Sequence, residues 1–353
     1  MKKDKAPGEK NFPVGRREFV LGTTAALLSS QLAFSEARPC PPYAQPEVAF
    51  NDNLAVPIPA NPSLGKGKDR ALVLGGGGEY FAAWMLGFAH GLKVKGVPYD
   101  MPDIIIGTSA GSLVGSTIAD GHLERLTDEF DFFGDFPKIL AALVPTGTAN
   151  PSQIRARDLC QIAHDASVAT IQWIGRGAMS ANNPPVSKLQ EMIETLTGNR
   201  SWPSPKFHAA TMDCYTGERL VVSEANKIPI SHAVSASMSL PGIFGPTWVG
   251  DRICMDGGVS ASSTHSDVVA GAKRALVVSL TDGTRGSGPR FTNIPNGLQQ
   301  ELRGIEAQGT KTLLIAANPG QVNLVSPAEI GPALRAGYDR AFQEADRVKA
   351  FWA

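Results

Sequence analysis

Short apolar runs rich in β-branched residues alternate, from Arg70 onward, with longer stretches whose apolar positions recur at helical spacing. The short runs end in glycine or small polar residues, as strands commonly do. Regular alternation of strands with amphipathic helices is typical of layered α/β folds, so the pattern predicts such a fold with a largely parallel sheet. The predicted strands are Ala71–Leu74, Ile104–Ile106, Phe207–Met212, Leu220–Ser223, Arg252–Met255, Ala275–Leu280 and Thr312–Ala316.

Between about residues 120 and 200 the apolar spacing favours helices, for example over Val186–Leu196, and no strand pattern is evident. We therefore expect a helical insertion beside the sheet, and one closing helix over Ala328–Lys349. The apolar residues of the insertion either pack in the core, which we favour, or line an acyl pocket or a lipid-facing surface. They are Ile139, Leu140, Leu143, Val144, Val168, Ile171, Trp173 and Ile174.

The amino terminus has the features of a targeting segment. Several lysines precede Arg16 and Arg17, and an apolar run containing polar residues then extends to Phe34. This run is too short and too polar to span a bilayer, and the segment resembles a twin-arginine export signal. We expect residues 1–37 to be that signal, residues 38–69 to be a leader arm, and the protein to be periplasmic without an integral membrane span.

Composition and charge exclude several classes of protein. The 353 residues are 42% apolar and 19% charged, which excludes a disordered chain. The 33 basic and 33 acidic side chains cancel, and no basic run is available to bind nucleic acid. The four cysteines lie too far apart in sequence for paired zinc ligands, so we expect no metal site and no disulfide framework. They are Cys40, Cys160, Cys214 and Cys254.

A G-x-S-x-G pentapeptide, Gly107–Gly111, follows one predicted strand and precedes a helical stretch of small residues. A sharp turn between a strand and a helix exposes the serine hydroxyl, and the crowding at that turn is relieved when Gly107 and Gly111 flank it. Ser109 would also lie at a helix N-terminus, which favours developing negative charge. Ser109 is therefore the candidate nucleophile.

Four consecutive glycines, Gly75–Gly78, follow the first predicted strand. Tyr80 and Phe81 stand where a dinucleotide fingerprint requires its third glycine, and the Gly-Lys-Ser/Thr ending of a Walker loop is absent. Besides a plain glycine turn, an oxyanion hole remains, in which side-chain-free residues let backbone N–H groups approach a tetrahedral intermediate. The predicted donors are the amides of Gly76, Gly77, Gly78 and Ala110.

Asp256-Gly257-Gly258 follows a later predicted strand, and alone it would indicate only a turn. In combination with the two glycine motifs that precede it, this triplet resembles the patatin-like phospholipase family in its bacterial branch. The resemblance extends from about Arg70 to Leu280. In the region where many relatives carry a basic residue after the glycine loop, this chain has Glu79 and Tyr80.

The resemblance implies a three-layer α/β/α fold with a central, mostly parallel sheet, and an acyl hydrolase domain over residues 70–353. It also implies a Ser–Asp dyad of Ser109 and Asp256, with Gly257 and Gly258 following the aspartate. The implied activity is hydrolysis of carboxylic esters of phospholipids, lysophospholipids or related lipids through an acyl-enzyme. No cofactor is needed, and the expected partner is a lipid or ester substrate, in solution or at a membrane surface.

Two alternative functions remain open from the sequence. Ser109, Asp256 and His265 occur in the chain order of the catalytic triad of α/β-hydrolases, which would indicate a small-ester hydrolase with an imidazole base. The chain could also be a lipid-binding protein on a hydrolase scaffold that has lost its chemistry. An intact Ser109 and Asp256 favour an enzyme over that second alternative.

Overall fold

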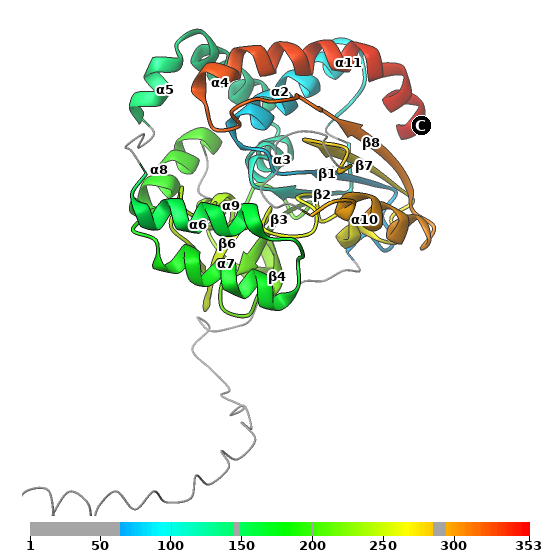
Figure 1. Cartoon of the computed structure of the whole chain (residues 1–353). Helices are drawn as coiled ribbons and strands as arrows, with labels where there is room; N and C mark the ends of the chain where they lie inside the picture. The colour runs from blue at the N-terminus through cyan, green and yellow to red at the C-terminus, as the bar shows by residue number, and fades with distance from the viewer. Residues whose placement is uncertain (1–63, 100, 144–148, 199–200, 285–293) are drawn as a thin grey trace, which may run out of the picture. The chain divides into compact units, whose positions relative to one another are not determined.

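An eight-stranded mixed sheet forms the centre of the computed structural model, which describes residues 64–99, 101–143, 149–198, 201–284 and 294–353 (Figure 1). The strand order is β5-β6-β3-β2-β1-β7-β8, and β4 pairs with β3 outside this path. The β3-β2-β1-β7-β8 pairings are parallel, whereas β4, β5 and β6 pair antiparallel. The strands are β1 (Arg70–Leu74), β2 (Ile104–Thr108), β3 (Phe207–Asp213), β4 (Arg219–Ser223), β5 (Thr247–Val249), β6 (Arg252–Asp256), β7 (Arg274–Ser279) and β8 (Lys311–Ala316).

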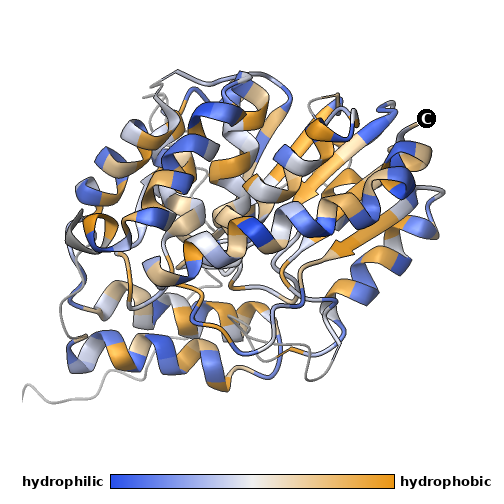
Figure 2. Cartoon of the chain, turned by 90° about the horizontal axis from the view of Figure 1, so that it is seen from above, coloured by the Kyte–Doolittle hydropathy of each residue, from blue (hydrophilic) through white to orange (hydrophobic). Residues whose placement is uncertain are grey.

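Helices cover both faces of the sheet, which confirms the predicted three-layer α/β/α arrangement. Side chains alternate across each strand, so Leu72 and Leu74 of β1 pack in one core while Ala71 and Val73 pack in another. The first core contains α2 (Gly78–Val94), α3 (Ala110–Asp120) and α11 (Ile330–Trp352), and the second contains η2 (Ser266–Val269) and α10 (Gly297–Glu306). Figure 2 shows the alternation of hydrophobic and hydrophilic residues along the covering helices.

Among the described residues between 120 and 200 the chain forms helices and no strand. The predicted core packing is confirmed for Ile171 and Ile174, which are buried against Met212 and Met255. Ile139, Val168 and Trp173 are instead exposed, and Leu140 is buried. The side chain of Leu143 and all of Val144 lie outside the described residues. The helices are α4 (Leu123–Asp135), α5 (Pro137–Leu143), α6 (Pro151–Ile162), α7 (Val168–Ser180) and α8 (Val186–Thr197).

Strand β5 was not predicted from the sequence. It has only three residues and pairs with β6 in an antiparallel hairpin, so it has too few positions to show a strand period. The remaining elements are α9 (Ile230–Met238), η1 (Glu224–Asn226) and η3 (Pro327–Glu329).

The register of the sheet brings two distant strand ends together. Thr108, the last residue of β2, pairs with Ala210 of β3, and the next β3 residue, Thr211, pairs with Asp256 at the end of β6. Ser109 and Asp256 therefore meet at one edge of the sheet, although they lie 147 residues apart in the chain.

The predicted export signal, residues 1–37, and most of the predicted leader arm lie outside the described residues. None of the helices in the described part of the chain combines the length and the apolar character needed to cross a bilayer.

Candidate active site

Ser109 occupies a strained turn between β2 and α3. Its φ of 51° and ψ of −121° are unusual for a residue with a side chain, and such strain is concentrated at functional sites. The turn needs the glycines on either side. A Cβ at Gly111 would lie 2.1 Å from the Leu74 carbonyl oxygen, and one at Gly107 would lie 2.4 Å from the Gly111 carbonyl oxygen.

The Ser109 hydroxyl donates a hydrogen bond of 2.8 Å to Asp256 Oδ2. Both residues are buried, and Oδ1 of Asp256 accepts a 2.7 Å bond from the Gly258 amide. Burial raises the pKa of Asp256 to about 7, although the Gly258 amide and the Ser109 hydroxyl both favour the ionised form and oppose the rise. A carboxylate of such raised basicity can take a proton near neutral pH.

Ser237, at the end of α9, supports the nucleophile and was not singled out from the sequence. Its hydroxyl accepts a 2.8 Å hydrogen bond from the Ser109 amide and donates one of 2.6 Å to the Ala210 carbonyl. The Ser237 carbonyl also accepts from the Gly257 amide at 3.3 Å. This residue lies in the stretch Ala236–Phe244, which precedes the aspartate strand, but a serine among small residues carries no signal of its own.

His265 lies beside the aspartate loop and not between Ser109 and Asp256. Its Nε2 is 2.7 Å from the Gly257 carbonyl oxygen and its Nδ1 is 3.4 Å from an Arg219 nitrogen. Burial, followed by the charge of Arg219, lowers the pKa of His265 to about 4, so the ring is neutral at pH 7. The geometry therefore pairs Ser109 with a carboxylate and leaves the imidazole outside the pair.

The predicted oxyanion donors differ in their availability. The Gly76 amide donates to the Ser263 carbonyl at 3.1 Å, so in this structure it already has a backbone partner. The amides of Gly77, Gly78 and Ala110 donate to no backbone carbonyl among the described residues. They belong to the N-terminal ends of α2 and α3, where backbone N–H groups have no partner within the helix.

Gly78 is the one position in this loop where the backbone itself requires glycine. Its φ is +65°, and a Cβ would lie 2.5 Å from the Leu324 carbonyl oxygen. Gly78 and Ala110, each the first residue of its helix, both line the cavity that contains Ser109.

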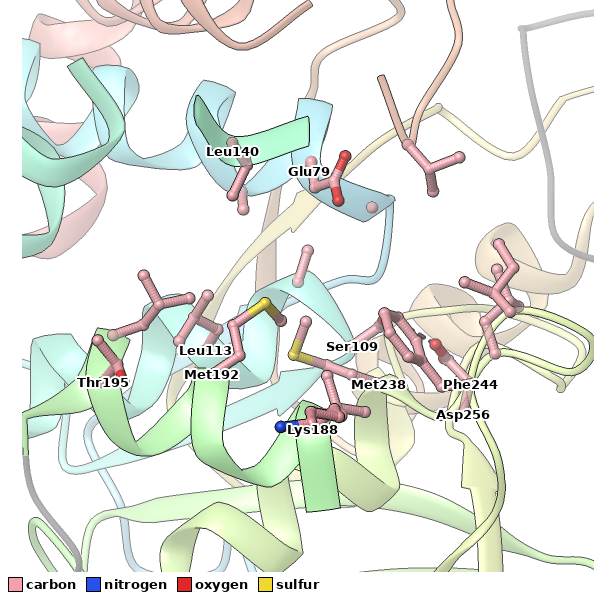
Figure 3. Close-up of a pocket in the computed structure, with 18 of the residues that line it drawn as sticks. Glu79, Ser109, Leu113, Leu140, Lys188, Met192, Thr195, Met238, Phe244 and Asp256 are labelled. Atoms are coloured by element: carbon pink, nitrogen blue, oxygen red, sulfur yellow. Dashed lines mark hydrogen bonds between the residues drawn. The ribbon is translucent and has the colours of Figure 1, made fainter. Parts of the chain in front are cut away.

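A cavity of about 380 Å³ opens from Ser109 and Asp256 (Figure 3). Its walls come mainly from α2, α3, α4, α5, α8 and α9, and most of its side chains are apolar. Leu140 lines it, whereas α7, with Trp173, does not. The apolar lining includes Leu113, Phe130, Phe133, Leu140, Leu189, Met192, Leu196, Met238, Leu240, Ile243, Phe244 and Val325.

The cysteine thiols and the possible metal ligands do not belong to the Ser109–Asp256 pair. Cys160, Cys214 and Cys254 are buried free thiols, and Cys40 lies outside the described residues. One group of side chains in the described part of the chain could hold a metal ion, with ligand atoms within 4.8 Å of one another: His265, Asp267 and Glu301. The guanidinium of Arg219, 2.7 Å from Asp267, already supplies positive charge there.

A mostly parallel sheet between helices, with a serine on a strained strand-to-helix turn beside a buried carboxyl and an apolar cavity, is an arrangement typical of α/β proteins that carry a serine nucleophile. The sequence profile of the patatin-like phospholipase family matches residues 72–267. The chain belongs to that family.

Several solved structures are similar in fold. The crystal structure of VipD from Legionella pneumophila is 13% identical with a TM-score of 0.36, over 79% of this chain and 67% of that chain. The crystal structure of the type III effector protein ExoU is 15% identical with a TM-score of 0.31, over 84% of this chain and 54% of that chain. The chain thus spans about half the length of ExoU. No curated protein shows significant similarity to it.

Proposed function

We propose that this protein is a serine acyl hydrolase that uses Ser109 and Asp256 as a catalytic dyad. The observation that carries the proposal is the 2.8 Å hydrogen bond from the Ser109 hydroxyl to the buried Asp256 carboxylate, at the end of an apolar cavity. The substrates we propose are carboxylic esters of phospholipids, lysophospholipids or related lipids, whose acyl chains match the apolar lining.

In this mechanism Asp256 takes the hydroxyl proton as Ser109 Oγ bonds to the ester carbonyl carbon. The oxyanion is held by the amides of Gly77, Gly78 and Ala110, and the proton passes to the alcohol oxygen as that bond to carbon breaks. Asp256 then takes a proton from water, whose oxygen attacks the acyl carbon. Ser109 regains a proton as it leaves, and the fatty acid is released.

A fluorophosphonate probe and an ester panel test this proposal. The probe should label Ser109 covalently, and the protein should hydrolyse members of a panel of phospholipids, lysophospholipids and p-nitrophenyl esters of graded chain length. Ser109→Ala is the matched control, since it removes only the attacking oxygen. Absence of both labelling and hydrolysis would favour a lipid-binding protein.

The activity should depend on pH through Asp256. Because the base must be ionised and burial raises its pKa to about 7, kcat/KM should fall about tenfold per pH unit below that value and level off above it. Burial also raises the pKa of Glu79, in the same cavity, to about 7. The pH profile is therefore also measured on Glu79→Gln, in which the fall of kcat/KM below pH 7 that is due to Asp256 should persist. A flat profile from pH 5 to 9 would contradict a carboxylate base.

Lipid substrates presented as micelles or vesicles should be hydrolysed faster than the same lipids below their aggregation threshold, because exposed aromatic side chains near the cavity should bind the lipid surface. Phe132 of α4 and Phe136, which follows α4, are 48% and 52% exposed, and α4 and α5 also supply Phe133 and Leu140 to the cavity wall. Because each ring is about half exposed, its loss removes about 0.75–1.5 kcal/mol of apolar contact with the lipid, so Phe132→Ser/Phe136→Ser should bind vesicles roughly tenfold more weakly or worse. Trp173→Ser, on a helix away from the cavity, is the control. Equal vesicle affinity of the wild type and all variants would show that Phe132 and Phe136 do not bind the lipid surface.

Export to the periplasm is a further part of the proposal, since Arg16-Arg17 precede a weakly apolar run. Such a signal is read by a receptor and does not act through charge alone. Replacing both arginines with lysine should retain the protein in the cytoplasm, as followed by cell fractionation. Normal periplasmic accumulation of that variant would contradict a twin-arginine route.

A further inference from the structure

Glu79 places a carboxyl group inside a cavity whose walls are otherwise mostly apolar. It is the second residue of α2, directly after Gly78, and it lines the same cavity as Ser109. Figure 3 shows its side chain projecting from the first turn of α2 toward the cavity, across from Met238 and Ser109.

The carboxyl group of Glu79 has an unmet need for a hydrogen-bond donor. Its Oε2 is buried and has no partner among the described residues. The cation that lines the cavity, Lys188, bonds to Glu191 at 3.1 Å, and both of those side chains are about two-thirds exposed. A buried acceptor without a donor is unfavourable, so the cavity is complementary to a ligand that brings a donor to this point.

The position of Glu79 restricts which part of the ligand can reach it. In the proposed mechanism the amide of its neighbour Gly78 holds the carbonyl oxygen, and Glu79 lines the same cavity as Ser109, so the part of the ligand next to the scissile ester is the part that reaches the Glu79 carboxyl. A bare negative charge there would oppose the oxyanion, and a hydroxyl bonded to the carboxyl would reduce that opposition. Above pH 8 Glu79 is ionised, because its pKa is about 7, and it can then only accept hydrogen bonds. A second ester beside the scissile one also offers only acceptors, so it would leave the carboxylate unpaired.

We propose that Glu79 forms a hydroxyl-binding subsite, which selects ester lipids carrying a free hydroxyl next to the scissile ester over lipids in which that hydroxyl is absent or acylated. Lysophospholipids and monoacylglycerols share this chemistry. The inference rests on the proposed hydrolase function and makes Glu79 a specificity residue of the same site.

Matched substrate pairs test the subsite. The full chain is assayed at pH 8.5, where Glu79 is ionised, with 1-palmitoyl-lysophosphatidylcholine and its 2-deoxy analogue, both below their aggregation thresholds. The ratio of their kcat/KM values is the readout. A hydrogen bond to a charged group contributes about 1.5–3 kcal/mol, so the wild type should prefer the hydroxyl by about 10- to 100-fold. The pair 1-palmitoylglycerol and its 2-deoxy analogue should give a similar ratio if the hydroxyl, and not the headgroup, is recognised.

Variants of Glu79 then separate this role from a structural one. Glu79→Leu should bring the ratio close to one, whereas Glu79→Gln, whose carbonyl oxygen still accepts, should keep part of it. Glu191→Leu, which removes the exposed carboxylate of the same cavity, should keep the wild-type ratio. Fluorophosphonate labelling of Ser109 shows that each variant is folded, and if the leucine variant does not label, the glutamine variant decides.

A kcat/KM ratio near one in the wild type would overturn the inference. So would an unchanged ratio in Glu79→Leu, or loss of the preference in Glu191→Leu. If the wild type labels at Ser109 but hydrolyses neither member of either pair, the hydroxyl-binding subsite is wrong while the dyad stands. Absence of labelling together with absence of hydrolysis of every ester would overturn the proposed function, and the subsite with it.

Discussion

Asp256→Asn should remove nearly all turnover while the protein remains folded. The amide keeps the size of the carboxylate and much of its hydrogen bonding, but it cannot take the Ser109 proton. A general base contributes roughly 10²–10⁴ in rate, and the nucleophile depends on it, so kcat on p-nitrophenyl butyrate should fall by at least that factor. Ser109→Ala should be similarly inactive, and the double variant little worse, because the two residues act as a unit.

The folded state should tolerate this change for an electrostatic reason. The pKa of Asp256 rises from its ordinary 3.8 to about 7 on folding. Between those values the native state binds more protons than the unfolded state, so the contribution of this carboxyl to stability falls as pH rises and stays low above pH 7. Asparagine does not ionise, so at pH 8 the variant should unfold in urea at a midpoint no lower than that of the wild type.

His265→Ala provides the decisive comparison. The imidazole bonds to the Gly257 carbonyl and lies near Arg219, so its loss should affect the aspartate loop only indirectly. The expected loss of kcat is below about tenfold, less than a general base supplies. If Asp256→Asn kept its activity and His265→Ala lost it, the base would be the imidazole and the dyad mechanism would be wrong.

Gly78→Ala should give the second large effect, a loss of about 10²–10³ in kcat. The new methyl group would lie 2.5 Å from the Leu324 carbonyl oxygen, so the loop must move and carry the Gly78 amide away from the oxyanion position. Loss of one oxyanion donor typically costs this factor. The effect should appear in kcat more than in KM, because the donor acts mainly in the transition state.

Gly96→Ala is a closely matched control for backbone strain. Gly96 has a φ of +68°, close to the +65° of Gly78, but nothing lies within 4 Å of its added Cβ. This variant should lose about 1 kcal/mol of stability and retain its kcat. Equal kcat values for the two variants would show that the Gly78 amide does not take part in catalysis.

The sequence by itself predicted the layered α/β fold, because strand period, helix period and glycine turns are local properties of the chain. Ser109 could be proposed for the same reason, because it follows a strand and glycines mark the tight turn around it. Asp256 alone indicated only a turn, and it was proposed because the three glycine motifs together resemble a known family. The short strand β5 was missed because three residues show no period. The glycine loop identified a candidate oxyanion hole, but it did not show which amides are available.

Tertiary structure alone decided how these pieces combine. Pairing of β3 with both β2 and β6 brings Ser109 to 2.8 Å from Asp256, across 147 residues that no local pattern spans. Long-range contacts also bond the Gly76 amide to Ser263 and place Ser237 beneath the nucleophile. Burial, which raises the pKa of Asp256, is a property of the packed fold, because a carboxyl loses its water only when other segments cover it.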